Sequence, residues 1–386
     1  MTPLIVAFLA SLAVLGYTYA GYPLAMALLA RLFPRPVRRA RFEPPVAIVI
    51  VVHNGAAWIE RKLESCLAQD YPAGRLSVIV ASDGSDDATC ERVASFGDPR
   101  VRLLDYPRRR GKAACLNDAV AACSEEVLVL TDVRQVLHPH AVRLLLENLA
   151  DAEVGAVSGA LTHGTGEGDG GLDAYWRYEQ SLRRAESGFH SMIGVAGALY
   201  AIRRECFREI PPQAILDDVM IPMQVAMLGR RVVFEGGAHA YDQPMHDLAR
   251  ERARKVRTLA GNFQLVALRP GFLAPWANPV FLQFVSHKLM RLLGPVALAV
   301  ALGTNAALAG EGPAFAAFLA LQLACYGAAA LGAMWPGSRR AWPVRLALAF
   351  VALNAFVVLG FLAFVSNRST HLWTSPAAAG RPRASR

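Results

Sequence analysis

The chain has little lysine, no paired cysteines and no glycine-rich nucleotide turn. Only four of its 40 lysine and arginine residues are lysines, at positions 62, 112, 255 and 288. The six cysteines include no C-x-x-C pair, which argues against a zinc site or a disulfide framework and favours reduced thiols. The apolar run Val46–Val52 is followed by HNGAAW rather than G-x-G-x-x-G, which argues against a nicotinamide oxidoreductase of the usual dinucleotide fold.

Long apolar segments with little or no charge lie toward both ends of the chain. Thr2–Ala30 contains no charged residue and exceeds the roughly 20 apolar residues that cross a bilayer. It lacks the basic start of a cleaved signal, so residues 1–33 are predicted to be a transmembrane anchor. Three more apolar segments, Leu289–Ala309, Pro313–Trp335 and Val344–Val365, predict about three transmembrane helices within residues 288–366, followed by a tail over 367–386.

Arginines next to these segments indicate an orientation. They follow the first span at positions 31, 35, 38, 39 and 41, and lie between the last two spans at positions 339, 340 and 345. The positive-inside rule places both groups in the cytoplasm, together with the large middle segment. Four spans would nevertheless leave the arginine-containing tail outside, which is a conflict within this scheme. Membrane-flanking arginines account for much of the net charge of +9, so no nucleic-acid partner is expected.

The middle of the chain alternates apolar runs with helical periodicity. The runs Val46–Val52, Leu76–Ala81, Val101–Leu104 and Val127–Arg134 read as buried strands, and each is followed by a helical pattern. This alternation predicts an α/β fold with a mostly parallel, doubly wound sheet. Prolines mark residues 34–45 as a linker to a domain over residues 46–268. The aromatic-rich segment 269–287 is predicted to be an amphipathic helix at the membrane surface.

Asp132 ends the apolar run within Val127–Arg134. Ligands of open α/β sheets bind beyond the carboxyl ends of the strands, so Asp132 is placed to hold a metal or a polar substrate. The alternative is an ordinary turn residue ahead of the next helix.

Several motifs together resemble one family. VAIVIVVHNGAAWIERKLESCLAQDYP, VIVASDGSDDAT, RRRGKAACLNDAV, VLVLTDVR and LDDVMIP occur in an order and spacing that resemble the family 2 glycosyltransferases with a GT-A fold. The likeness covers about residues 45–265, and the flanking apolar segments suit the membrane-embedded polysaccharide-synthase branch. It divides the domain into a donor half, 46–150, and an acceptor half, 151–268.

The resemblance implies an activity and its setting. The protein would be an inverting glycosyltransferase that moves a sugar from a cytoplasmic nucleotide-sugar, expected to be a UDP-sugar, to a glycan or lipid-linked acceptor. The product would belong to a cell-surface or extracellular polysaccharide. The protein would be multi-pass in the cell (inner) membrane with a cytoplasmic catalytic domain. Membrane lipids and polysaccharide export proteins would be its partners.

The same resemblance implies donor-binding residues. Asp83 would meet the nucleobase and ribose, Lys112 would contact the diphosphate, and Asp132 would hold Mg²⁺ or Mn²⁺. A helix start at Lys112 already favours an anion, although a solvated basic loop is the alternative. The family often has a second acid in a D-x-D pattern, whereas this chain has Arg134 at the third position. Either Asp132 holds the metal with phosphate and water, or Arg134 contacts phosphate directly.

On the acceptor side, Asp218 matches the family's general base, with Asp217 beside it. Without the resemblance, two adjacent acids ahead of a helix would read as capping residues. Gly194 and Gly197 would let an acceptor approach the backbone closely. Arg254 and Arg257 would bind diphosphate or face lipid head groups. Only Arg257 matches the Q-x-x-R-W motif of processive members, which argues against a synthase that threads very long polymers.

Two alternative functions stay open from sequence. One is transfer of a single sugar to a polyisoprenyl phosphate. The other is a catalytically weak scaffold of a polysaccharide secretion complex, which Arg134 in place of the second acid suggests.

Overall fold

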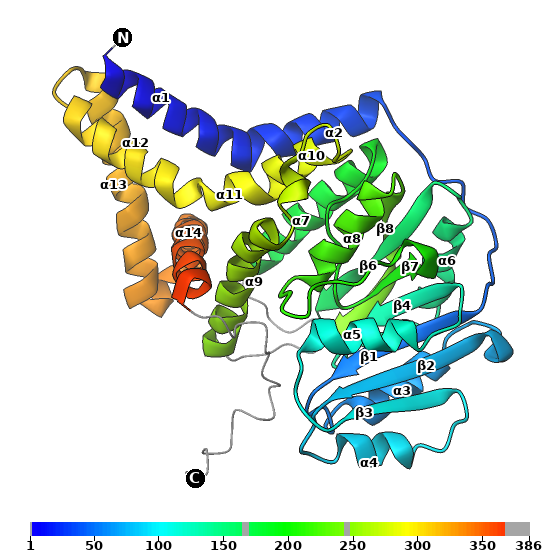
Figure 1. The fold of residues 1–386 in the computed structure, drawn as a ribbon. Coiled ribbons are helices and arrows are strands. Elements are labelled where there is room, and N and C mark those ends of the chain that lie inside the picture. The colour runs from blue at the N-terminus through cyan, green and yellow to red at the C-terminus, as the bar shows by residue number, and fades with distance from the viewer. Residues whose placement is uncertain (1, 164–169, 243–247, 367–386) are drawn as a thin grey trace.

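The computed structural model describes residues 2–163, 170–242 and 248–366 (Figure 1). One eight-stranded sheet has the order β3-β2-β1-β4-β7-β6-β8-β5. Its strands are β1 Val46–Val52, β2 Leu76–Asp83, β3 Val101–Tyr106, β4 Val127–Thr131, β5 Val136–Leu137, β6 Val154–His163, β7 Tyr200–Arg203 and β8 Arg231–Asp242. The helices of the same domain are α3 Ile59–Leu67, α4 Thr89–Ala94, α5 Lys112–Ala121, α6 Ala141–Leu149, α7 Gly170–Phe189, α8 Asp217–Met227 and α9 Leu248–Leu268.

The donor half of the sheet is parallel. β1 pairs with β2 and β4, and β2 pairs with β3, all in parallel. Every residue of β1 is buried, because helices cover both faces of the sheet. Alternate residues of β1 pack with α5 and α8 on one face and with α3 and α6 on the other. The predicted α/β fold is therefore confirmed, and the carboxyl ends of β1, β2 and β4 share one edge.

The acceptor half is mixed rather than parallel. β7 runs antiparallel to both of its neighbours, β4 and β6, and β5 runs antiparallel to β8. Only β6 and β8 pair in parallel there. The strand that joins the two halves is thus only four residues long and points against its neighbours, so the expectation of a mostly parallel sheet applies to the first half alone.

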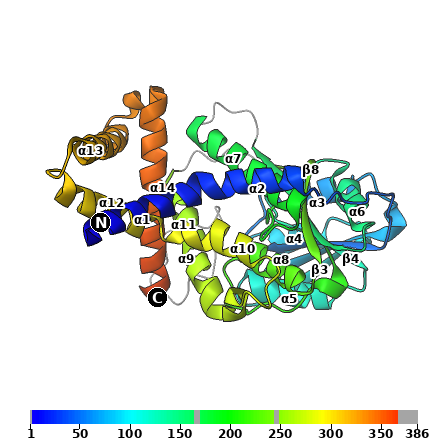
Figure 2. The same ribbon diagram turned by 90° about the horizontal axis from the view of Figure 1, so that it is seen from above.

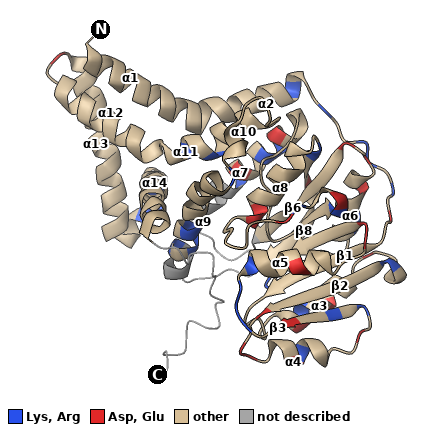
Figure 3. Ribbon diagram, in the orientation of Figure 1, with Lys and Arg blue, Asp and Glu red and all other residues tan. Residues whose placement is uncertain are grey.

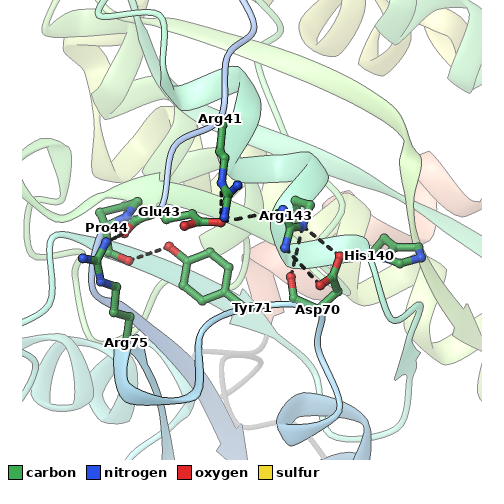
Figure 4. A network of polar contacts seen from close by, with 8 residues as sticks. All are labelled: Arg41, Glu43, Pro44, Asp70, Tyr71, Arg75, His140 and Arg143. Carbon is green, nitrogen blue, oxygen red and sulfur yellow. Dashed lines mark hydrogen bonds and ion pairs between the residues drawn. The ribbon is translucent and has the colours of Figure 1, made fainter.

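The linker lies against the α/β domain instead of standing free. Figure 4 shows its end held by the α3–β2 connection and by the start of α6. The Tyr71 hydroxyl donates to the Pro44 carbonyl at 2.6 Å, and Arg75 donates to the Glu43 carbonyl at 2.5 Å. Arg143 of α6 lies 3.7 Å from the Glu43 carboxylate and 2.8 Å from that of Asp70. The end of the linker is therefore fixed on the domain that follows it.

Apolar helices at both ends are confirmed. α1 Pro3–Gly16, the π-helical turn η1 Tyr17–Gly21 and α2 Tyr22–Leu32 form one helix of 30 residues, long and apolar enough to cross a membrane. α13 Pro313–Met334 and α14 Trp342–Ser366 are also long and apolar enough to cross a membrane. Figures 1 and 2 show these three helices crossing one another rather than running as a parallel bundle. Figure 3 shows α1 and α13 almost without charge, whereas the catalytic domain carries both signs.

The segment predicted as the first C-terminal span is bent. Residues Phe281–Leu292, which comprise α10 Phe281–Gln283, the π-helical turn η5 Phe284–Leu289 and α11 Met290–Leu292, form the first arm. The second arm is α12 Gly294–Leu308, and the angle between the two is 55°. By length and composition this pair is either a broken span or a re-entrant loop, so the described residues hold three or four candidate spans.

The prediction of one amphipathic helix over residues 269–287 is wrong. The structure has a short 3₁₀ turn at Pro270–Leu273, and helix begins again only at Phe281. Pro275 and Pro279 interrupt the segment, since proline removes a backbone donor and clashes with the preceding turn. Asn278 fixes the break, because its side chain donates to the Phe272 carbonyl at 2.7 Å and accepts from the Val280 amide at 3.0 Å.

A buried polar cluster connects the apolar helices to the catalytic domain. Tyr22 of α2 donates to Glu186 of α7 at 2.6 Å, and the same Glu186 oxygen lies 2.8 Å from Nδ1 of His287. Arg291 pairs with Glu179 of α7 at 2.5 Å. Tyr22 and Glu186 are each only 1% exposed, so these groups depend on one another for hydrogen bonds.

Replacing Glu186 should therefore destabilise the protein. In Glu186→Leu, the Tyr22 hydroxyl and His287 lose their shared partner, and each buried orphan costs about 1–3 kcal/mol. The thermal unfolding midpoint of the detergent-purified protein should fall clearly. Arg143→Met, which removes a half-exposed ion pair on the linker side, is the control and should shift the midpoint much less. Equal shifts would contradict the role given to the cluster.

Candidate active site

The carboxyl edge of the sheet meets the start of α8 through one lysine. Lys112 is the first residue of α5, and its Nζ lies 3.0 Å from Asp132 Oδ1 and 2.9 Å from Asp217 Oδ2. Asp132 directly follows β4 in the donor half, and Asp217 opens α8 in the acceptor half. Three residues spread over the chain are therefore brought together at one point, where the two halves of the domain join.

The charge of Lys112 is stabilised by these two carboxylates. Burial alone would lower the pKa of the Lys112 ammonium, but the charges of Asp132 and Asp217 outweigh it, and the net shift is upward. The side chain of Asp132 is 42% exposed, whereas that of Asp217 is 10% exposed. One face of the Asp132 carboxylate thus remains open to solvent and to a ligand.

Asp83 holds the loop that presents Lys112. It ends β2, is fully buried, and accepts hydrogen bonds from the backbone amides of Arg110 at 2.6 Å and Gly111 at 3.1 Å. The two segments touch so closely that a Cβ at Gly84 would lie 2.6 Å from the Arg109 nitrogen. The structure thus gives the Asp83 carboxylate a role in positioning this loop, and its contact with a nucleobase stays a prediction.

Asp132 is suited to a metal that is shared with a substrate. Among the described residues, no group of three or more His, Cys, Asp or Glu side chains is arranged to hold a metal ion. Mg²⁺ is commonly held by one or two carboxylates together with substrate phosphates and water, and does not need a cage of protein ligands. A half-exposed carboxylate at the end of a central strand fits this mode.

The side chain of Arg134, near the carboxyl edge of the sheet, is paired with an acid. Its guanidinium forms an ion pair with Asp242, the last residue of β8, whose side chain is 1% exposed. Gln135 donates to the same Asp242 oxygen at 3.1 Å. The ion pair therefore fixes the far side of the turn after Asp132, and direct contact of Arg134 with phosphate stays a prediction.

Asp218 lies under a glycine-containing loop. Burial and then the neighbouring charge of Asp217 raise the pKa of Asp218 from 3.8 to about 6. A Cβ at Gly197 would lie 3.5 Å from the Asp218 Cβ and 3.8 Å from its Oδ2, and one at Gly194 would lie 3.4 Å from the Asp218 carbonyl oxygen. The two glycines thus keep the space beside this carboxylate narrow but free of side chains.

The two arginines of α9 differ in position. Arg257 is half-buried, and burial lowers its pKa while Asp217, Asp218 and Asp132 act in the opposite direction. Arg254, one turn earlier, is exposed. Arg257 is therefore electrostatically part of the site, and Arg254 lies at its margin.

Sequence reasoning missed two buried residues at the site. Tyr200, at the start of β7, is 1% exposed, and its hydroxyl has no hydrogen-bond partner among the described residues. It lines a cavity of about 10 Å³ with Lys112, Gly197 and Asp217, roughly the room for one water molecule. Lys62 is the other, and a signal for it was present, because Ile59, Lys62, Leu63 and Cys66 follow the i, i+3, i+4, i+7 spacing of a buried helix face.

Comparison with known proteins agrees with this arrangement. Residues 47–211 match the sequence model of glycosyl transferase family 2. A stretch of 109 residues is 36% identical to the succinoglycan biosynthesis protein ExoO of Rhizobium meliloti (strain 1021), covering 28% of this chain and 30% of that protein. Another, of 182 residues, is 30% identical to an N-acetylglucosaminyltransferase of the same organism, covering 44% of this chain and 42% of that protein. The chain therefore matches less than half the length of either relative.

A solved structure extends the likeness beyond the catalytic domain. The mannosyltransferase PcManGT from Pyrobaculum calidifontis, determined in complex with GDP-Man and Mn²⁺, superposes with a TM-score of 0.70. The match covers 94% of this chain and 99% of that chain at 24% sequence identity. The two proteins therefore share a fold over nearly the whole of both chains.

Removing the Asp83 carboxylate should loosen the loop before Lys112. In Asp83→Ala the amides of Arg110 and Gly111 lose charge-assisted hydrogen bonds of about 1.5–3 kcal/mol, so amide hydrogen exchange in residues 107–112 should accelerate about 10- to 100-fold. Asp118→Asn is the matched control, because the Asp118 carboxylate meets side chains, the exposed Arg110 guanidinium at 2.6 Å and the Tyr106 hydroxyl, whereas the Asp83 carboxylate meets backbone amides. Unchanged protection in Asp83→Ala would show that the loop is held by other contacts.

Proposed function

We propose that the chain is a family 2 glycosyltransferase with a GT-A fold, which transfers a sugar from a nucleotide-sugar with inversion at the anomeric carbon; the match of residues 47–211 to that family's sequence model supports this. The donor would be a UDP-sugar, and the acceptor a glycan or a lipid-linked sugar in polysaccharide synthesis. One observation carries the proposal: Lys112 contacts Asp132 of the donor half and Asp217 of the acceptor half at the same time. A donor diphosphate and an acceptor hydroxyl can therefore meet at this point.

The donor side supplies positive charge and a metal ligand. Lys112 opens α5, where free backbone amides and the helix dipole also favour an anion, so the diphosphate would lie beside its ammonium. Asp132 would hold Mg²⁺ or Mn²⁺ together with phosphate oxygens, and the ion would neutralise charge that develops on the departing diphosphate. Asp83 would keep the Lys112 loop in place, and the nucleoside would bind beside Asp83.

The acceptor side supplies a base. Asp218 would take the proton of the acceptor hydroxyl while that oxygen forms a bond to the anomeric carbon, and the bond from this carbon to the diphosphate oxygen would break with its electron pair. A carboxylate whose pKa is about 6 is a stronger base than an ordinary aspartate and is still mostly ionised at neutral pH. Gly194 and Gly197 would let the acceptor approach, and Arg257 would face its anionic groups or the diphosphate.

The apolar helices suggest where the reaction takes place. Three helices pass the length and composition test for spanning a membrane, and arginines flank them. By the positive-inside rule the catalytic domain would face the cytoplasm and use a cytoplasmic nucleotide-sugar. Membrane lipids would surround the spans. The likeness to ExoO, a succinoglycan biosynthesis protein, supports a role in bacterial polysaccharide synthesis. Export proteins would then be its partners.

The test is a donor screen with the detergent-purified full chain, reading nucleotide release and product size together. The wild type should release nucleotide from a UDP- or GDP-sugar in the presence of Mn²⁺ or Mg²⁺ and membrane lipid. Asp218→Asn should bind donor normally but turn over about 10²–10⁴-fold more slowly, the usual contribution of general-base catalysis. Below about pH 6 Asp218 becomes protonated, so wild-type turnover should fall about tenfold per pH unit, and the variant should lack this acidic limb.

Two outcomes would contradict the proposal. Undiminished turnover in Asp218→Asn would remove the base, and failure of the wild type to release nucleotide from any donor would favour a scaffold. A lipid-soluble monosaccharide as the sole product would instead identify a polyisoprenyl-phosphate transferase.

Lys112 allows a separate measurement of donor binding. Lys112→Met should weaken binding of UDP or GDP about 10- to 100-fold, because a charge-assisted contact is lost and two carboxylates are left to repel the diphosphate. Binding of the nucleoside alone should change little, as measured by calorimetry. Arg110→Met removes a neighbouring charge that is directed toward Asp118 and serves as the control. Equal loss for nucleoside and diphosphate would argue against a phosphate contact.

A further inference from the structure

A lysine is buried beneath the turn that carries Asp132. Lys62 lies on α3, and the residue is 1% exposed. Its Nζ donates to Thr131 Oγ1 at 2.6 Å and to the Gln135 carbonyl at 2.8 Å. Its helix neighbours Leu63 and Cys66 are fully buried and belong to the hydrophobic core on this face of the sheet. The ammonium therefore lies between an apolar helix face and the polar turn that follows β4.

The two acceptors of Lys62 stand on either side of the turn. Thr131 directly precedes Asp132, and Gln135 follows Arg134, so one ammonium ties both ends of this three-residue turn to α3. Val133, within the turn, also packs closely against Gly55, since a Cβ placed on Gly55 would lie 3.3 Å from a methyl group of Val133. The position of the Asp132 carboxylate is thus set by contacts from beneath as well as by the end of β4.

The same hydrogen bonds reach the acceptor side. The Thr131 hydroxyl accepts from Lys62 and donates to the Ala198 carbonyl at 2.6 Å. Ala198 follows Gly197, the glycine that lies against Asp218. A continuous path therefore runs from Lys62 through the donor turn to the loop beside the base.

A lysine is a costly choice at a core position. A methionine would fill similar space without the desolvation cost of an ammonium, which becomes tolerable only through hydrogen bonds and nearby negative charge. Burial lowers the pKa of Lys62, and the nearby negative charge of Asp132 acts in the opposite direction. The group is thus coupled to the turn in geometry and in charge.

We propose that Lys62 is a positioning residue, which holds the Asp132 turn in register with the acceptor loop so that Asp132 can share a divalent metal with the donor diphosphate. The proposal rests on the proposed function for its ligand, while the geometry of the turn can be tested without one. Lys62 does not touch substrate. It acts through Thr131, Gln135 and Asp132.

The experiment compares Lys62→Met with Leu63→Ala in the full-length, detergent-purified protein. Leu63 is equally buried on the same helix, and its hydrocarbon side chain cannot hydrogen-bond to the turn, so its truncation reports lost packing alone. Calorimetric titration with UDP and GDP at graded Mn²⁺ concentrations should show that Lys62→Met needs about tenfold more Mn²⁺ for half-maximal nucleotide binding. Leu63→Ala should lower the thermal unfolding midpoint but leave this Mn²⁺ requirement unchanged.

Hydrogen exchange provides an arm that does not depend on a nucleotide. Amides of residues 131–135 should exchange at least about tenfold faster in Lys62→Met than in Leu63→Ala. Should Lys62→Met not fold, Thr131→Val breaks the same path and should give the same two changes, whereas Thr131→Ser, which keeps the hydroxyl, should restore wild-type behaviour.

The outcomes separate this proposal from the proposed function. An unchanged Mn²⁺ requirement in Lys62→Met, or the same change in Leu63→Ala, would overturn the role of Lys62. Failure of the wild type to bind UDP and GDP would count against the proposed function. In that case faster exchange of residues 131–135 in Lys62→Met alone would still support the positioning role, and equal exchange would refute it.

Discussion

The ammonium of Lys112 is the contact on which the arrangement of the site depends. Asp132, Asp217 and Asp218 bring three carboxylates to one place, and like charges in a partly buried site repel one another. Lys112 lies about 3 Å from two of them and offsets part of this repulsion. The sheet brings Asp132 and Lys112 together. β1, β2 and β4 are parallel and end at one edge, and the loop that Asp83 holds presents Lys112 at that edge.

The apolar helices fix the acceptor side of the same site. α9, which carries Arg257, packs against α14, and α7 packs against α2. The cluster around Glu186 adds buried hydrogen bonds between α2, α7 and the bent helix at residues 281–292. Arg183 of α7, Lys288 of the bent helix and Arg257 of α9, which interact electrostatically with Asp218, are therefore carried by elements attached to the apolar helices. This attachment gives a physical reason for a membrane-associated acceptor in the proposed reaction.

The strands of the donor half could be predicted because their signal is local. VAIVIVV and VLVLT are uninterrupted apolar runs, and such runs belong to strands with both faces covered. β7 could not be predicted in the same way. It has four residues, and its antiparallel pairing with β4 is a long-range contact that no local pattern encodes. The wrong prediction of a helix over residues 269–287 has a different origin. The aromatic residues of this segment suit an amphipathic helix, but Pro275 and Pro279 interrupt it, and the effect of proline on a helix is readable from sequence.

The paired acids of α8 show how adjacent residues acquire different tasks. Successive side chains on a helix point about 100° apart, so the carboxylates of Asp217 and Asp218 face different neighbours although they lie close together. Asp217 is directed to Lys112 and forms an ion pair with it, while Asp218 lies beside Gly197, with burial and the Asp217 charge raising its pKa. Two carboxylates in unlike surroundings are the usual means by which one acid stays paired and another serves as a base. The resemblance already implies Asp218 as the base from sequence, and what the fold adds is that Asp217 pairs with Lys112.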